Sequence, residues 1–222
     1  MSIFSNYIRN FDWTYLLTGA AALIAITFHE LSHGFIAYKL GDPTAKRLGR
    51  LSLNPIRHID IWGLLMLIVA GFGWAKPVPV NMQNFKHPKR GMALTALAGP
   101  ASNLLLAFAA LLLAALLWPF ENTIVSYIVL FLFILANISI GLGIFNLIPI
   151  PPLDGSKMLF SLFPDRIYYN ILKYERYGMI LMIVILSTEI ITPFLNAARS
   201  AVFYALWVLA SAPVEWLYGL IR

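Results

Sequence analysis

The sequence predicts an all-α polytopic membrane protein of about five transmembrane helices, with a re-entrant or short-strand region between the first two. Two observations predict this class. Hydrophobic residues make up 60% of the 222 residues and charged residues 12%, and the mean hydropathy is +0.77, which lies outside the range of soluble globular domains. Apolar runs also recur along the chain, and most are close to the roughly 20 residues that cross a bilayer as a helix.

Length, charge and cysteine content restrict the organisation further. We expect residues 1–222 to form a single membrane-embedded domain, with a core at about residues 13–160 and accessory helices at about residues 178–218. The absence of cysteine excludes disulfides and thiolate metal ligands. A net charge of +6 would favour nucleic acid for a soluble protein. Here it indicates basic loops facing anionic lipid, so we expect a multi-pass protein of the cell membrane and no nucleic-acid partner.

The first apolar run and the region after it differ in character. Residues 13–40 would form a helix of about 42 Å, which must tilt or overhang the hydrocarbon. Residues 50–54 alternate like a short strand. Residues 61–73 are apolar but short for a span, which suits a re-entrant segment. Residues 74–81 contain two prolines, so we expect extended chain at an edge or in a loop.

The rest of the chain contains the other expected spans. Small residues at positions 98–103 permit close helix contact in the second span. The remaining spans are predicted at residues 91–118, 125–148, about 178–194 and 198 to about 217.

The first span contains three ionisable side chains, His29, Glu30 and His33. On a helix the two histidines share one face, one turn apart, and can bind the same zinc ion. Glu30 stands beside them as a base that activates water. The alternative is a pair of satisfied core histidines, but ionisable groups in a membrane span are costly and usually functional. The sequence therefore predicts a catalytic zinc site, with one zinc per chain.

A catalytic zinc usually has three protein ligands and one open position. Asp154 is the best candidate for the third ligand, because it lies on a proline-broken segment where a helix leaves the membrane. It could equally belong to a simple Asp-Gly turn beyond the helix end. Spacing alone leaves both interpretations open.

Three separated motifs resemble those of the site-2 protease family of intramembrane zinc metalloproteases, in the same order. They are His29-Glu30-x-x-His33, Gly99-Pro100-x-x-Asn103 and Asn146-x-x-Pro149-x-x-x-Leu153-Asp154-Gly155. The resemblance covers roughly residues 20–160. The chain looks like a compact form of the family, without a PDZ domain. Ile61 departs from the family pattern, which has proline after His58-x-Asp60.

The resemblance implies roles for individual residues. By it, Asp154 is the third zinc ligand and Glu30 the catalytic acid/base. It also implies that Asn146 lines the site and helps to hold an oxyanion, and that Asn103 lies on a core helix facing the site.

The expected reaction is hydrolysis of peptide bonds in or near transmembrane segments of membrane proteins, as in regulated intramembrane proteolysis. A transmembrane substrate must unwind locally, because its peptide groups are hydrogen-bonded within its own helix. Lys76, Val78 and Val80 are predicted to bind the freed backbone by strand addition. Two alternatives remain: a non-catalytic protein that binds or traffics membrane helices, and a metal transporter. The oligomeric state is not predicted.

The ligand set predicts the topology. If residues 61–73 crossed the bilayer, Asp154 would emerge on the face opposite the histidines. If they are re-entrant, all three ligands lie on one side. In the re-entrant, five-span arrangement that side holds every one of the 16 lysines and arginines except Arg9 and Arg199. The positive-inside tendency then places the active site nearer the cytoplasmic face.

Overall fold

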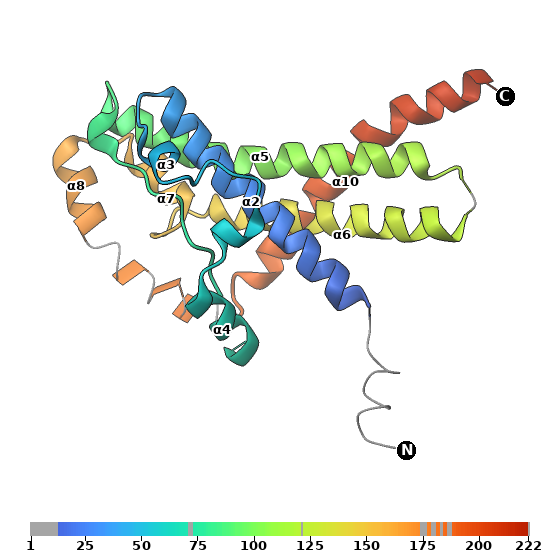
Figure 1. Ribbon diagram of the computed structural model, residues 1–222, viewed down its shortest axis with the longest axis horizontal. Helices are drawn as coiled ribbons and strands as arrows, with labels where there is room; N and C mark the ends of the chain where they lie inside the picture. The colour runs from blue at the N-terminus through green and yellow to red at the C-terminus, as the bar shows by residue number, and fades with distance from the viewer. Residues whose placement is uncertain are drawn as a thin grey trace, which may run out of the picture.

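The computed structural model describes residues 13–70, 73–120, 122–173, 177–178, 181–182, 184–185 and 188–221. Four long helices dominate these residues (Figure 1), and each is long and apolar enough to cross a membrane. They are α2 (Thr14–Lys39), α5 (Pro88–Leu117), α6 (Thr123–Asn146) and α10 (Thr192–Ile221). The predicted all-α polytopic class is confirmed.

Short helices fill the connections between the long ones. They are α3 (Thr44–Arg47), η1 (Pro55–His58), α4 (Ile61–Ala70), η2 (Met82–Asn84), α7 (Asp154–Phe160) and α8 (Asp165–Lys173).

Local chemistry explains where the long helices begin and end. After α2 the chain turns at Gly41, whose φ of +108° is rarely adopted by residues with a side chain. Pro88 occupies the first turn of α5, where its missing N–H costs no helix hydrogen bond. Asn122 caps α6 by accepting a hydrogen bond from the N–H of Ile124.

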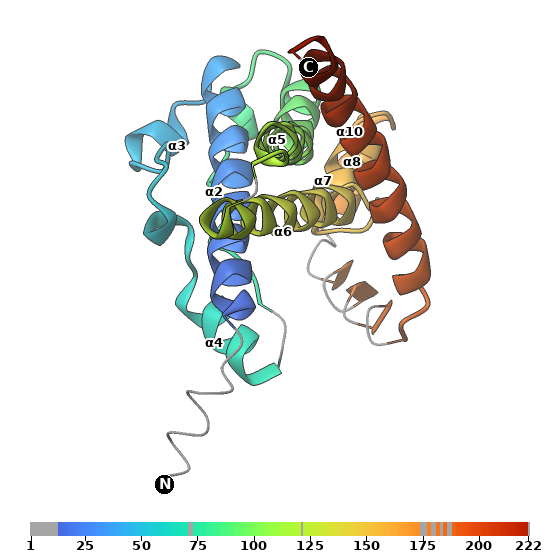
Figure 2. The ribbon, with the colours of Figure 1, turned by 90° about the vertical axis from the view of Figure 1, so that its right-hand side faces the viewer.

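The antiparallel pair α5 and α6 forms the centre of the molecule, with α2 on one side and α10 on the other (Figure 2). The core where these helices meet is rich in alanine, and such small side chains let helix backbones approach closely. Trp207 of α10 packs on Phe133 of α6, with ring centroids 5.3 Å apart. The buried core residues include Ala21, Ala107, Ala110, Leu111, Ala114, Leu132, Ala136, Ile140 and Ala210.

No regular strand forms in the described part of the region between α2 and α5. The strand expected at residues 50–54 is replaced by irregular chain with a bend at Leu53, because its polar groups bond elsewhere: Asn54 caps η1, and Arg50 donates through Nη2 to the carbonyl of Lys76 at 2.7 Å. Residues 74–81 are extended, as predicted, but their pairing is limited to an isolated antiparallel bridge between Ile59 and Ala75.

The two ends of the short apolar segment at residues 61–73 meet. Besides the bridge, the N–H of Lys76 donates to the carbonyl of His58 at 2.9 Å. A Cβ at Gly63 would lie only 2.0 Å from the carbonyl oxygen of Trp74, so α4 lies directly against the returning chain. Residues 71–72 lie outside the described residues. The meeting of the ends supports a segment that returns to its own side, and its entry into the bilayer stays a prediction.

The last helix differs from the predicted spans. Most residues of the span predicted at about residues 178–194 are described. Those up to residue 185 are helical, but residues 188–191 lie outside any helix and α10 already begins at Thr192, so the predicted span is interrupted. The helix α10 is then continuous across the break expected at residues 195–197. The start of α10 lies against the end of α6, since a Cβ at Gly141 would lie 3.7 Å from Cδ of Arg199. At the other end of α10, Tyr218 donates to the carbonyl of Leu116, at the end of α5, at 3.1 Å. The helix therefore runs in the same general sense as α5 (Figure 1), whereas the five-span arrangement has it running against α5.

Candidate metal centre

The two histidines of α2 and the first residue of α7 come together inside the helical bundle. His29 and His33 lie edge to face, with ring centroids 4.6 Å apart. Asp154 places Oδ2 at 3.1 Å from Nε2 of each ring. All three side chains are buried, and one potential ligand atom from each lies within 4.8 Å of the others. The structure thus brings together the three residues that the sequence proposed as ligands.

The turn between α6 and α7 explains how Asp154 reaches the histidines. The chain folds back on itself so tightly that a Cβ at Gly155 would lie 2.1 Å from the carbonyl oxygen of Leu147. Only glycine fits there. The turn is made by residues 147–153, and Asp154 and Gly155 are instead the first two residues of α7. The simple Asp-Gly turn beyond the helix end is therefore not what forms, and the start of α7 is what directs the carboxylate toward α2.

A second glycine lets α5 approach the two rings. A Cβ at Gly99 would lie 2.5 Å from Cε1 and Nε2 of His33 and 2.6 Å from Cε1 of His29. The rings therefore occupy the space that a side chain at position 99 would take. This contact explains why the Gly99-Pro100-x-x-Asn103 motif accompanies the histidine motif in the chain.

The hydrogen bond on the far side of His33 shows that the group suits a metal. Nδ1 of His33 lies 2.7 Å from the carbonyl oxygen of Thr95, which can only accept, so Nδ1 carries the proton. For a neutral ring the lone pair of Nε2 then faces the carboxylate of Asp154 at 3.1 Å. Two facing acceptors need a positive charge between them, which either a proton on Nε2 or a metal ion supplies.

The distances and the donor types favour zinc. Ligand atoms of a tetrahedral zinc site, at about 2.0–2.1 Å from the ion, lie about 3.3 Å apart, close to the separations seen here. Two imidazoles and one carboxylate leave a fourth position open, as in hydrolytic zinc sites. The carboxylate form of Asp154 is the one that binds a metal.

Glu30 lies outside the group of ligand atoms. Its Oε2 accepts a hydrogen bond from the N–H of Val78 at 2.8 Å. Val78 is buried against α2, where a Cβ at Gly34 would lie 3.0 Å from its Cγ1. The extended segment therefore runs beside the histidine motif, as the prediction for residues 74–81 requires.

The other two predicted segment residues lie in the same extended stretch. Lys76 is exposed, and both of its backbone polar groups bond to neighbouring loops. Val80 is half-buried, and no hydrogen bond joins its N–H to another residue in the described part of the chain.

Asp42, which sequence reasoning did not single out, fixes the far end of this segment. Its carboxylate is fully buried and accepts hydrogen bonds from the N–H of Asn81 and from Nδ2 of Asn84, each at 2.7 Å. It also accepts from the N–H of Thr44 at 3.1 Å. The signal in the sequence was the Gly41-Asp42-Pro43-Thr44 run, in which a carboxylate follows a helix end. Its partners, about forty residues further along, could not be inferred from spacing.

The two predicted asparagines have different positions. Asn103 of α5 is fully buried, with Nδ2 at 3.2 Å from Nδ1 of His29. Asn146, at the end of α6, donates through Nδ2 to the carbonyl of Leu142 in its own helix at 2.9 Å. The structure brings Asn103, and not Asn146, into hydrogen-bonding contact with the metal group. A role for Asn146 in holding an oxyanion stays a prediction.

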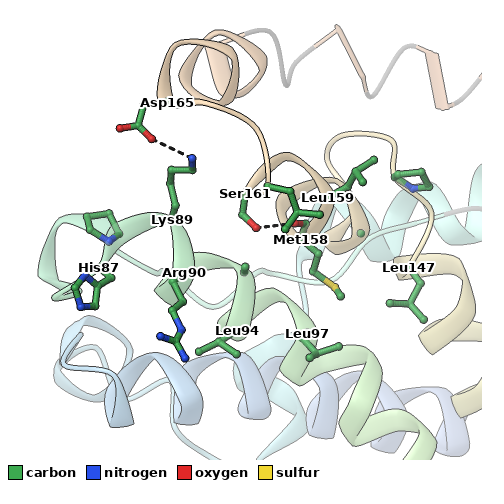
Figure 3. A pocket seen from close by; sticks show the side chains of 15 residues that line it. His87, Lys89, Arg90, Leu94, Leu97, Leu147, Met158, Leu159, Ser161 and Asp165 are labelled. Atoms are coloured by element: carbon green, nitrogen blue, oxygen red, sulfur yellow. Dashed lines mark hydrogen bonds and ion pairs between the residues drawn. The ribbon is translucent and has the colours of Figure 1, made fainter.

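A cavity of about 1180 Å³ lies beside the metal group, between the start of α5 and α7 (Figure 3). Leu94, Leu97 and Met158 line its apolar wall. An ion pair between Lys89 and Asp165, at 3.0 Å, crosses from α5 to α8 at its edge. None of the three candidate ligands lines this cavity, although Gly155, the neighbour of Asp154, does.

Comparison with known proteins identifies the family. The sequence model of peptidase family M50 matches residues 118–188. The protein named "Putative zinc metalloprotease YwhC" from Bacillus subtilis is 39% identical over 188 residues, which cover 81% of this chain and 86% of the relative. The chain belongs to peptidase family M50. The resemblance to the site-2 proteases, which form this family, is confirmed.

Two mycobacterial relatives also support the assignment of this protein to family M50. The protein named "Putative zinc metalloprotease Rip2" from Mycolicibacterium smegmatis is 31% identical over 186 residues, covering 82% of this chain and 69% of the relative. Its namesake from Mycobacterium tuberculosis is 28% identical over 200 residues, covering 88% and 74%. No solved structure matches the chain significantly. The segment matched by the family model includes Asp154 but not the histidine motif.

Proposed function

We propose that this M50 peptidase is an intramembrane zinc metalloprotease that hydrolyses peptide bonds in or near transmembrane segments of membrane-protein substrates. The observation that carries the proposal is the meeting of Asp154 with His29 and His33 inside a bundle of apolar helices. His29, His33 and Asp154 would hold one zinc ion. When bound there, zinc supplies polarisation of a carbonyl group and activation of water.

Glu30 is the proposed acid/base. Its Oε2 is held by the N–H of Val78, which leaves Oε1 to take a proton from the attacking water and to pass one to the leaving amine. The same hydrogen bond fixes the extended segment beside the site. The position of Glu30 outside the ligand group favours this role over that of a further metal ligand.

The extended segment at residues 76–81 is the proposed docking strand. An unwound substrate exposes peptide groups that need partners within the membrane. Pro77 and Pro79 have no N–H, and the N–H of Val78 is taken by Glu30. Val80 therefore supplies the donor for a substrate carbonyl, and the Val78 carbonyl can accept.

The proposed topology places the metal site nearer the cytoplasmic face of the cell membrane. The lysines and arginines at positions 39–90 and 157–173 lie on the side of the metal site whichever way α10 runs, provided that residues 61–73 return to their own side. This charge asymmetry and the meeting of Ile59 with Ala75 support the topology. A transporter or a non-catalytic helix-binding protein would not require a carboxylate such as Glu30, which lies next to the metal ligands without being one of them.

Zinc analysis and a cleavage assay on the same detergent-purified preparation test the proposal. We expect about one zinc per chain and cleavage of a helical membrane substrate that stops when a chelator removes the metal. Stoichiometric zinc with no cleavage of any transmembrane substrate would favour the non-catalytic alternative. Zinc that exchanges across a sealed vesicle membrane would favour a transporter.

A further inference from the structure

One face of α5 presents three residues to the two imidazoles at four-residue spacing: Thr95, Gly99 and Asn103. The carbonyl of Thr95 holds Nδ1 of His33, Gly99 leaves room for both rings, and the amide of Asn103 meets Nδ1 of His29. Residues four apart lie one above another on a helix, so a single helix face reaches both rings. Each of the two histidines is thus contacted by α5 at Nδ1, the ring nitrogen that points away from Asp154.

The contact at His29 is incomplete as it stands. Asn103 has 0% of its surface exposed, and its Oδ1 forms no hydrogen bond with any residue that the structure describes. Its Nδ2 points at Nδ1 of His29, at 3.2 Å. An amide nitrogen can only donate, so Nδ1 is here the acceptor and the ring proton sits on Nε2, which donates to Oδ2 of Asp154 at 3.1 Å.

This hydrogen-bond pattern cannot persist when a metal binds. A metal on Nε2 of His29 requires that nitrogen to be unprotonated, so the ring proton moves to Nδ1. Nδ1–H would then face the NH₂ group of Asn103, with two donors opposed. A half-turn of the amide about the Cβ–Cγ bond exchanges Oδ1 and Nδ2 in nearly the same volume. The oxygen that lacks a partner then accepts the Nδ1–H.

We propose that Asn103 is a positioning residue of the metal centre: its Oδ1 accepts the Nδ1–H of His29 and thereby fixes the tautomer and ring orientation that leave Nε2 for zinc. The inference rests on the proposed role of His29 as a ligand. With this role for Asn103 the two histidines are held in the same way: Nδ1–H of His33 donates to the carbonyl of Thr95, and Nδ1–H of His29 donates to Oδ1 of Asn103. Such partners of metal-binding histidines commonly change metal affinity by about 10–100-fold.

A purely structural role is the alternative. Asn103 also lies at the contact between α5 and α6, where a Cβ at Gly143 would lie 3.5 Å from its own Cβ. A buried amide can stabilise such a helix contact without affecting the metal. A structural role would change unfolding and leave zinc affinity as it is.

The test compares Asn103→Leu with Asn103→Asp in the full-length, detergent-purified protein. Leucine keeps the branched skeleton of asparagine, although it is bulkier, and accepts no hydrogen bond, whereas aspartate keeps an oxygen acceptor and has no N–H. Ser102→Ala is the matched control, since Ser102 donates to the carbonyl of Gly99 within α5. Zinc affinity is measured by chelator competition, and ligand geometry by the visible absorption spectrum of the Co²⁺-substituted protein.

We expect Asn103→Leu to weaken zinc binding by about 10–100-fold and to alter the Co²⁺ spectrum. Asn103→Asp and Ser102→Ala should stay within a few-fold of the parent. Parent-like zinc affinity in the leucine variant, or an equal loss in the leucine and aspartate variants, overturns the inference. If the leucine variant does not fold, a tenfold loss in Asn103→Asp overturns it alone. A parent that holds no zinc, or a His29→Ala variant that keeps it, instead contradicts the ligand assignment beneath it.

Discussion

Adjacent residues of one helical turn have separate partners at this site. His29 faces Asp154, whereas Glu30 turns away and accepts the N–H of Val78. The separation follows from helix geometry, because neighbouring residues on a helix point about 100° apart. Metal binding and proton transfer can therefore be removed independently by single substitutions.

Glu30→Gln keeps the size of the side chain and removes the basic carboxylate. Zinc should stay near one per chain while hydrolysis falls by about 10²–10⁴-fold. Asp154→Ala removes a ligand, so zinc content and hydrolysis should both fall, as they should for His33→Ala. Metal analysis and cleavage are measured on each variant in one preparation. Normal cleavage by Glu30→Gln, or full zinc retention by Asp154→Ala, would show that these roles are wrongly assigned.

Gly99→Ala tests the close approach of α5 to the rings. A methyl group at this position would lie 2.5 Å from ring atoms of His33, so the helix or the rings must shift. We expect a loss of about 1–3 kcal/mol in the free energy of unfolding, together with weaker zinc binding. Gly19→Ala is the control, because a Cβ there meets no atom within 4 Å. Equal behaviour of the two variants in unfolding and zinc titrations would argue against tight packing at Gly99.

At the scale of elements, the extended segment is held at its two ends by carboxylates from α2 and the turn after it. Glu30 accepts the N–H of Val78, and Asp42 accepts the N–H of Asn81. Between these points Val80 has an N–H without a partner among the described residues. The segment is thus fixed in place while its middle stays available for pairing.

Val80→Pro removes that donor and should weaken cleavage while zinc stays bound. Val80→Ala is the matched control, because it shortens the side chain and keeps the N–H. The comparison is made from the rate of cleavage at several substrate concentrations, alongside zinc content. Unchanged turnover in Val80→Pro, or an equal loss in both variants, would argue against docking by strand addition.

Asp42→Asn tests the anchor at the far end of the segment. Burial raises the pKa of Asp42, but hydrogen bonds from Thr44, Asn84 and the N–H of Asn81 outweigh it, so the pKa lies below the ordinary value of 3.8. A carboxylate with a lowered pKa stabilises the fold at neutral pH, and this contribution is lost as the pH falls through the folded-state pKa.

We therefore expect Asp42→Asn to lose about 1–3 kcal/mol at pH 7, with zinc retained and cleavage reduced. The difference between variant and parent should narrow only below pH 3.8. Unfolding midpoints measured across this pH range check the sign. A difference that is constant with pH would mean that the ionised carboxylate is not what stabilises the turn.

At the scale of the whole molecule, the course of α10 decides where the chain ends. Its contacts with Gly141 and Leu116 show that it runs with α5, so its end lies at the end of the bundle away from the metal group. The five-span arrangement would instead return the chain to the side of the metal group.

Single cysteines in this cysteine-free chain can test the topology with a membrane-impermeant maleimide. Cysteines at Leu53, Gln83 and Leu162, all exposed, should be labelled from the cytoplasmic side. Phe120→Cys and Gly219→Cys should be labelled from the other side, and the cysteine-free parent is the control. Labelling of positions 53 and 83 from opposite sides would contradict the return of residues 61–73. Labelling of position 219 from the cytoplasm would contradict the course of α10.

The sequence by itself determined the class of the fold and the nature of the site. Apolar runs of membrane-spanning length must form helices, because backbone groups in hydrocarbon can only be satisfied within the segment. The four-residue spacing of His29 and His33 places both on one face by helix geometry alone. These are local properties, so they could be predicted from short stretches of the chain.

Only the tertiary structure decided which distant groups meet. Asp154 lies 125 residues from His29, and spacing left its Asp-Gly turn and its role as a ligand as open alternatives. The partners of Glu30, Asp42 and His29 likewise come from other helices and loops, and the carbonyl of Thr95 gives no side-chain signal at all. The course of α10 depends on its packing against α5 and α6, because the direction expected from the sequence rested only on the number of spans counted before it. Hydropathy fixes which segments enter the membrane, whereas contacts between helices fix how they are arranged there.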